Sequence, residues 1–212
     1  MISIKWKKNL ETIIEELRKF SFSYLDKYAP SKQQLRTYLL KKYFKSPNSF
    51  IAKNQLLDLI DLVISDLEKN QFLSDKFYSD SKTKNFIKKG YSLNKIRNYL
   101  FSKGIGEKDI KNSISKINID EQDQDFFSAI KTCKKRRIGP NREEDNRTLF
   151  YKKDMSILAR SGFDYSTSKK VLDLPKSDYI KLLKLLWFII SSFFFFQVKV
   201  YSFFDHIPHE NK

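Results

Sequence analysis

Ser31-Lys-Gln-Gln-Leu-Arg-Thr-Tyr-Leu39 returns later in the same chain as Ser92-Leu-Asn-Lys-Ile-Arg-Asn-Tyr-Leu100. Serine, an aliphatic residue, arginine, tyrosine and leucine stand at the same offsets in both copies, and a lysine follows each of them, Lys42 and Lys103. A weaker third copy covers Asp154 to Phe163. A motif that recurs at intervals of about sixty residues predicts an array of similar units, each packed mainly on its neighbours.

The residues around these copies have the spacing of helices. Apolar side chains recur at positions 10, 13, 14 and 17, at 35, 39 and 40, and at 56, 59, 60, 63, 64 and 67. A spacing of i, i+3 or i+4, and i+7 is typical of amphipathic helices. Ser31 and Ser92 stand where an N-cap begins a helix, and Gly90, Gly104 and Gly162 stand where a left-handed C-cap ends one. Only five glycines and five prolines interrupt the 212 residues, which also favours helices.

These patterns predict an all-α fold in which three helical modules stack in tandem into an extended, curved array. We expect a first module over residues 1–70 and a second over 71–119. An acidic and basic linker followed by a third module occupies 120–175, and an atypical apolar C-terminal tail occupies 176–212. An array of this kind usually presents a long face for binding.

The charge of the chain indicates the kind of partner. It has 41 Lys and Arg against 25 Asp and Glu, a net charge of +16. Such a surplus predicts nucleic acid or an acidic protein surface as the partner. The number of lysines carries little weight, because a chain rich in Lys, Asn, Ile and Phe is typical of an AT-biased genome. The positions of the arginines are more informative, because guanidinium groups hold phosphates and carboxylates with paired hydrogen bonds.

The sequence lacks the motifs of common enzymes. It has neither a phosphate-binding loop nor a dinucleotide fingerprint. The two histidines, His206 and His209, lie in the tail without the cysteine or carboxylate partners of a metal site. Cys133 is the single cysteine, which favours a reducing compartment; basic neighbours could lower its pKa, but an ordinary thiol is the preferred interpretation. We therefore predict a binding protein that is not an enzyme and uses no cofactor or metal.

Several stretches, taken in their order and spacing, resemble the RecX family of RecA recombinase regulators. They are Glu68–Tyr78, Gly90–Arg97, Lys103–Ile105, Lys135–Pro140 and Leu158–Phe163, and the last two are similar to the alphaproteobacterial form of the family. The resemblance covers residues 10–173. It implies an all-α fold of tandem three-helix modules forming an elongated, curved array. It also implies a cytoplasmic, monomeric protein in the groove of a RecA filament, touching single-stranded DNA through the filament. There it would slow ATP hydrolysis, strand exchange and the repressor cleavage of the SOS response.

The resemblance also implies binding residues. Arg36, Arg97 and Arg160 would face the filament, with Lys95 and Lys103 beside Arg97, and Lys135, Arg136, Arg137 and Arg142 would form a second patch. For each of them, a role in solubility or in pairing with a neighbouring helix is the alternative.

The turn Gly104-Ile105-Gly106 supports a second function, a non-specific DNA-binding protein. It looks like the hairpin of a helix-hairpin-helix element, whose backbone amides hold duplex phosphates. A helix C-cap followed directly by the next helix is the simpler interpretation, and we favour it.

The tail contains Leu185 to Val198, a nearly pure apolar run. As a helix it would span about 21 Å, short of the roughly 30 Å hydrocarbon core of a bilayer. A membrane anchor, an extra segment packed on the third module and out-of-frame sequence are three open interpretations. We favour the last two together over an anchor.

Overall fold

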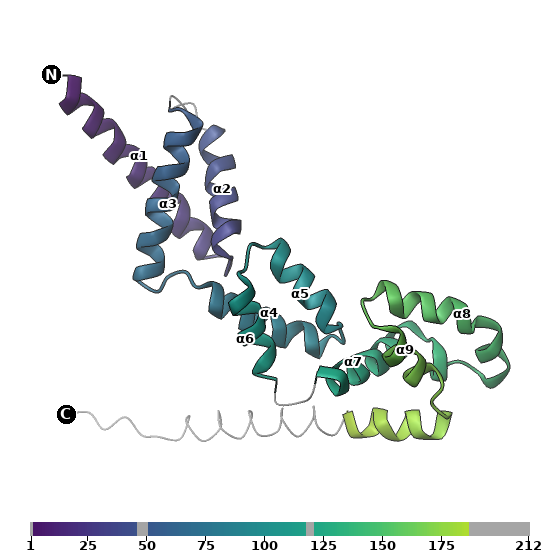
Figure 1. Cartoon of the computed structure of the whole chain (residues 1–212). Helices are drawn as coiled ribbons and strands as arrows, with labels where there is room; N and C mark the ends of the chain where they lie inside the picture. The colour runs from purple at the N-terminus through teal and green to yellow at the C-terminus, as the bar shows by residue number, and fades with distance from the viewer. Residues whose placement is uncertain (1, 46–50, 118–120, 187–212) are drawn as a thin grey trace, which may run out of the picture. The chain divides into compact units, whose positions relative to one another are not determined.

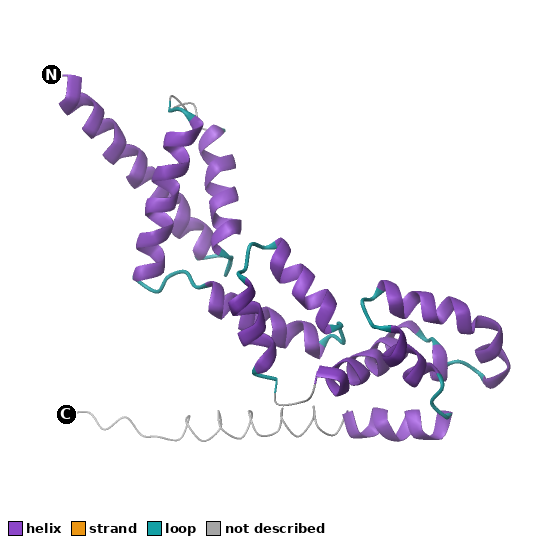
Figure 2. Ribbon diagram, in the orientation of Figure 1, coloured by secondary structure: helices purple, strands orange, loops and turns teal. Residues whose placement is uncertain are grey.

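The computed structural model describes residues 2–45, 51–117 and 121–186 (Figure 1). The elements in these ranges are α1 (Ile2–Leu25), α2 (Lys32–Phe44), α3 (Lys53–Lys69), α4 (Asp75–Lys88), α5 (Leu93–Ser102), α6 (Glu107–Ser115), α7 (Glu121–Arg136), the 3-10 turn η1 (Gly139–Asn141), α8 (Glu144–Arg160) and α9 (Tyr165–Leu172). Residues 176–186 are also helical, and the described ranges contain no strand (Figure 2). The predicted all-α fold is confirmed.

The helices belong to two compact units. The first comprises residues 1–86 and 95–118, and the second comprises 87–94 and 119–212. Each unit has its own cluster of buried apolar side chains. The division into three modules at residues 70, 119 and 175 remains a prediction.

The core of the first unit is built where α1, α2 and α3 pack on one another (Figure 1). Its fully buried side chains include Leu17, Leu35, Leu39, Leu56, Ile60 and Val63. The helical periodicity of the sequence singled out all of these positions, so this core was correctly predicted. Tyr43 is buried with them, at the repeat position where Gly104 stands in the second copy, and burial raises the pKa of its hydroxyl.

The start of α2 confirms the expected N-cap. Ser31 accepts a hydrogen bond on its hydroxyl from the Gln34 amide at 3.2 Å, and the Gln34 side chain accepts one from the Ser31 amide at 3.1 Å. This reciprocal capping box satisfies two amides that the helix cannot pair internally. It also holds the Ser31 hydroxyl in place for a hydrogen bond to the carbonyl of Lys103, which is distant in the sequence.

The remaining helices of the first unit are joined by polar contacts that are partly or fully buried. The hydroxyls of Tyr78 on α4 and Tyr99 on α5 lie 3.3 Å apart, and those of Thr83 on α4 and Ser113 on α6 lie 3.1 Å apart. Tyr99 also packs its ring edge-to-face on Phe86, with centroids 4.7 Å apart. The tyrosine of the second repeat copy therefore fastens α5 to α4.

The core of the second unit is formed by α7, α8 and α9 together with residues 176–186. Buried side chains of the three labelled helices include Ala129, Ile130, Cys133, Leu158, Val171 and Leu172. Tyr179 is buried against the same core, and Leu182, Leu183 and Leu186 are half-buried there. The tail thus begins as a packed segment.

The rest of the apolar tail lies outside the described residues, which end at 186. Among the helices in the described ranges, none has the length and hydrophobicity needed to cross a bilayer.

Candidate functional site

The sequence repeat corresponds to a polar joint that is built twice. In the first unit, the Ser31 hydroxyl donates to the carbonyl of Lys103 at 2.7 Å, and the Lys32 amide donates to the Asp75 carboxylate at 2.8 Å. A single hydroxyl and a single carboxylate therefore connect the start of α2 to both α5 and α4. We call this arrangement the serine–aspartate joint.

The second unit contains the same arrangement. The Ser92 hydroxyl donates to the carbonyl of Ser161 at 2.8 Å, and the Leu93 amide donates to the Asp125 carboxylate at 2.8 Å. Both acceptor carbonyls directly precede a glycine with positive φ, Gly104 at 76° and Gly162 at 90°. Of the residues that the two repeat copies share, the serine is the one whose side chain builds the joint in each unit.

The glycine turn after α5 belongs to this joint. A Cβ on Gly104 would lie 2.5 Å from Cβ of Gln33 on α2, and its φ is strained for any other residue. The amides of Gly104 and Ile105 already donate to carbonyls of α5 at 2.9 and 3.2 Å. Amides used in this way cannot hold phosphates, so the turn has the geometry of a C-cap followed by the Gly106 N-cap of α6.

Three predicted binding residues lie on or just after α5. Lys95 is exposed, Arg97 is half-buried, and the Lys103 ammonium lies 5.3 Å from the centre of the Tyr99 ring. Arg36, the equivalent of Arg97 in the first copy, donates to the Asp61 carboxylate on α3 at 2.6 Å. The Arg36 guanidinium is thus tied to its own unit, although about a third of its side chain is exposed.

The end of α7 brings together the clearest basic cluster. Lys134, Lys135, Arg136 and Arg137 are all exposed, and we call them the α7 basic end. Arg137 has a positive φ of 55°, and the following amide of Ile138 donates to the Cys133 carbonyl at 3.1 Å. This C-cap ends the helix and keeps the four cationic residues consecutive on one exposed turn.

Arg142, predicted to belong to the same patch, points into the unit instead. Its Nε and Nη2 donate to the two oxygens of Asp154 at 2.7 and 2.8 Å, and Asp154 is fully buried. The hydrogen bonds to Asp154 raise the pKa of Arg142. Arg142 also lies over the Phe150 ring at 4.7 Å. Its guanidinium is therefore used in the fold, whereas Arg160, at the end of α8, is exposed.

Sequence reasoning missed several residues that shape these surfaces. Asp75, Asp125 and Asp154 received no role, although each accepts a backbone hydrogen bond. Arg147 donates to the carbonyls of Leu172 and Leu174 at 2.9 and 2.7 Å and closes the end of α9. No local pattern marks these long-range partners.

Two features of the described residues bear on chemistry, the possible metal ligands and the single cysteine. No group of three or more His, Cys, Asp or Glu residues in them could hold a metal ion. Cys133 is fully buried, and burial raises the pKa of its thiol to about 12. Its lysine and arginine neighbours in sequence therefore do not activate it, as the preferred interpretation of an ordinary thiol expected.

Within the described residues, the protein is all-helical, and each of its two units contains one serine–aspartate joint. No family model matches the chain. The sequence is 28% identical over 163 residues to regulatory protein RecX of Myxococcus xanthus strain DK1622, covering 74% of this chain and 84% of the relative. The fold is similar to a crystal structure of regulatory protein RecX, with a TM-score of 0.57, 19% identity and coverage of 78% of this chain and 74% of the other. Both comparisons thus support the resemblance to the RecX family that the sequence indicates.

Proposed function

We propose that this protein regulates the RecA recombinase by binding the RecA–DNA filament and inhibiting its ATPase, strand-exchange and coprotease activities. The sequence similarity to a regulatory protein RecX over three quarters of the chain carries this proposal. The protein acts by binding, without catalysis of its own, as a monomer in the cytoplasm.

The exposed cations support a contact with the filament. The α7 basic end presents four consecutive positive side chains, and Lys95 and Arg160 add two more exposed ones on α5 and α8. Cations of this kind suit DNA phosphates and acidic protein surfaces. Arg136 and Arg137 are the best candidates for direct contact, because Arg36 and Arg142 are paired within the fold.

The decisive experiment measures the ATPase rate of a RecA filament preassembled on single-stranded DNA while this protein is titrated. We expect inhibition below one protein per recombinase subunit, together with weak binding to the same DNA alone, measured by anisotropy. Inhibition only at concentrations that already coat naked DNA would contradict the proposal and indicate competition for phosphates.

Charge reversal at the α7 basic end tests the placement of the contact. We expect Arg136→Glu with Arg137→Glu to weaken filament binding at least tenfold, because both side chains are exposed and charge reversal adds repulsion. Lys69→Glu with Lys108→Glu is the matched control, since it changes the net charge equally at two other exposed positions. Equal losses in both variants would show a general charge effect and contradict this site.

A further inference from the structure

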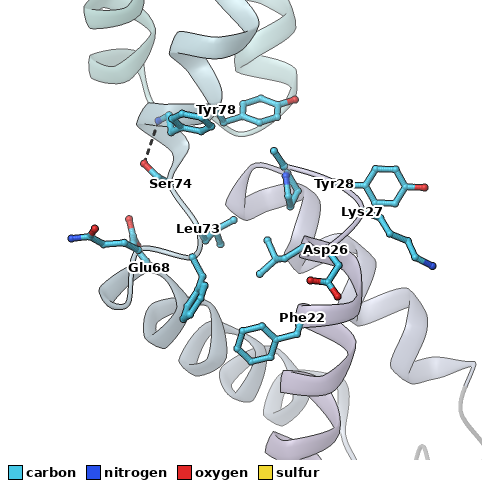
Figure 3. Close-up of a pocket in the computed structure, with 14 residues that line it drawn as sticks. Phe22, Asp26, Lys27, Tyr28, Glu68, Leu73, Ser74 and Tyr78 are labelled. Atoms are coloured by element: carbon cyan, nitrogen blue, oxygen red, sulfur yellow. Dashed lines mark hydrogen bonds between the residues drawn. The ribbon is translucent and has the colours of Figure 1, made fainter. Parts of the chain in front are cut away.

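A hollow lies in the first unit between the end of α1 and the turn that joins α3 to α4 (Figure 3). Its volume is about 940 Å³. Phe22, Leu25 and Tyr28 line it from α1 and the residues that follow, and Phe72, Leu73 and Phe77 line it from the turn and the start of α4. Figure 3 shows Phe22 and Leu73 projecting from these two elements into the space between them.

Three phenylalanines that line this hollow are exposed to water. Phe22 is 43% exposed, Phe72 59% and Phe77 68%. Phe22 and Phe72 meet edge-to-face with their centroids 5.5 Å apart, so part of this surface is already organised. Exposed apolar patches mark interaction sites, and aromatic anchors contribute most of the binding energy once a partner excludes water.

The charges of the hollow identify the kind of partner. The carboxylates of Asp26 and Glu68 line it, and although Lys27 lines it too, the side chain of Lys27 runs away from it in Figure 3. Glu68 is paired with Lys32 at 3.0 Å, whereas Asp26 forms no ion pair within the described residues. Within the described residues, the hollow is thus an apolar surface whose one unpaired carboxylate belongs to Asp26. This carboxylate favours a segment that has its own cation.

We propose that this hollow binds an apolar segment of a protein partner, with a lysine or arginine of that segment placed against Asp26. The proposal rests on the proposed function, since the segment then belongs to the recombinase in the filament. Large apolar side chains of the segment fill the space between Phe22, Phe72 and Phe77. The hollow and the α7 basic end thus recognise different chemistry, the first an apolar segment of the protein and the second negative charge.

Two matched pairs of variants test the hollow in the full-length protein. Phe77→Ala is compared with Phe101→Ala, since Phe101 is 73% exposed in the same unit but lies outside the hollow. Asp26→Lys is compared with Asp58→Lys on the exposed face of α3. Binding of each labelled variant to preassembled RecA filaments and to naked single-stranded DNA is measured by anisotropy, and thermal unfolding checks the fold.

We expect Phe77→Ala and Asp26→Lys to weaken filament binding at least tenfold, and both controls to stay within about twofold of the unmodified protein. Unchanged filament binding in Phe77→Ala would overturn the proposal while leaving the regulator function intact. Loss of naked-DNA binding alone would also overturn it, and would assign the aromatics to stacking with bases. If the unmodified protein does not bind filaments, the proposed function fails and this proposal fails with it.

Discussion

Aspartates that accept backbone hydrogen bonds hold this basic chain together at the level of single residues. Asp75 accepts from Lys32, Asp125 from Leu93, Asp154 from Gly139 and Asp164 from Thr167. An ionised carboxylate is a stronger acceptor than a neutral group, so each contact is a charge-assisted bond. Each of these four carboxylates therefore has a structural role in the fold.

Asp164 allows this role to be tested with pH. It caps α9 by accepting from the Thr167 amide at 2.6 Å, and this bond lowers its pKa below the ordinary 3.8. A lowered pKa in the folded state means that the contribution to stability is complete at neutral pH. That contribution is lost as pH falls through about 4 toward the folded pKa.

We therefore expect the free energy of unfolding of Asp164→Asn to fall less than that of the unmodified protein between about pH 5 and pH 3. Asparagine still caps the helix but does not titrate, whereas Asp164→Ala should cost about 1 kcal/mol at pH 7. Urea unfolding at several pH values measures both effects. Parallel pH profiles for the asparagine variant and the unmodified protein would show that the cap does not depend on the charge of Asp164.

At the scale of elements, the glycine turn between α5 and α6 gives a sharp comparison. Gly104→Ala places a Cβ 2.5 Å from Gln33 at a φ of +76°, whereas a Cβ on Gly106 meets nothing within 4 Å. We expect Gly104→Ala to destabilise the protein by about 1–3 kcal/mol, from backbone strain and the displaced α2 contact. Gly106→Ala should leave the stability within about 1 kcal/mol of the unmodified protein.

Chemical denaturation of the two alanine variants checks this, and naked-duplex binding adds a second readout. If Gly106→Ala abolished duplex binding without changing stability, the turn would be a DNA-binding hairpin after all. Equal stability of the two variants would show that the joint tolerates a side chain at Gly104.

The helices could be predicted from the sequence, because burial of one helix face leaves a periodic pattern of apolar residues. Leu35 and Leu39 show it on α2, and the N-cap at Ser31 follows from its place before that pattern. The hydrogen-bond partners that lie far apart in the sequence could not be predicted. Nothing near Ser92 in the sequence points to the carbonyl of Ser161, and nothing near Arg142 points to Asp154.

Of the two candidate binding surfaces, one could be predicted from the sequence and the other could not. The run from Lys134 to Arg137 is visible as consecutive cations, and the structure leaves all four exposed. The aromatic hollow could not be found in this way, because Phe22 and Phe72 are far apart in the sequence and phenylalanine is common throughout the chain. Only the packing of α1 against the turn after α3 brings them together.

For the whole molecule, the two units have separate cores, so we expect a destabilising substitution in one unit to leave the stability of the other unchanged. Asp154→Ala removes the acceptor of Gly139 and Arg142 inside the second unit and leaves a guanidinium without its partner. We expect a loss of about 3–5 kcal/mol in that unit. Hydrogen exchange measured by mass spectrometry should then show faster exchange in α7, α8 and α9, while α1, α2 and α3 keep their protection.

Arg18→Ala is a suitable control, because the side chains of Arg18 and its partner Asp66 are 49% and 39% exposed. It should change exchange little anywhere, since surface ion pairs contribute about 0–1 kcal/mol. Faster exchange in α1, α2 and α3 of the Asp154→Ala protein would show that the two units unfold as one.

The serine–aspartate joint makes this protein a natural starting point for longer designed scaffolds. Of its four hydrogen-bonding groups, two belong to the main chain, so a grafted copy needs little more than a serine, an aspartate and a glycine at the right places. The other residues of the segment can then be substituted, or redesigned to bind other ligands. A duplicated segment would dock on its neighbour through the same contacts, which suits the fold to growth by gene duplication.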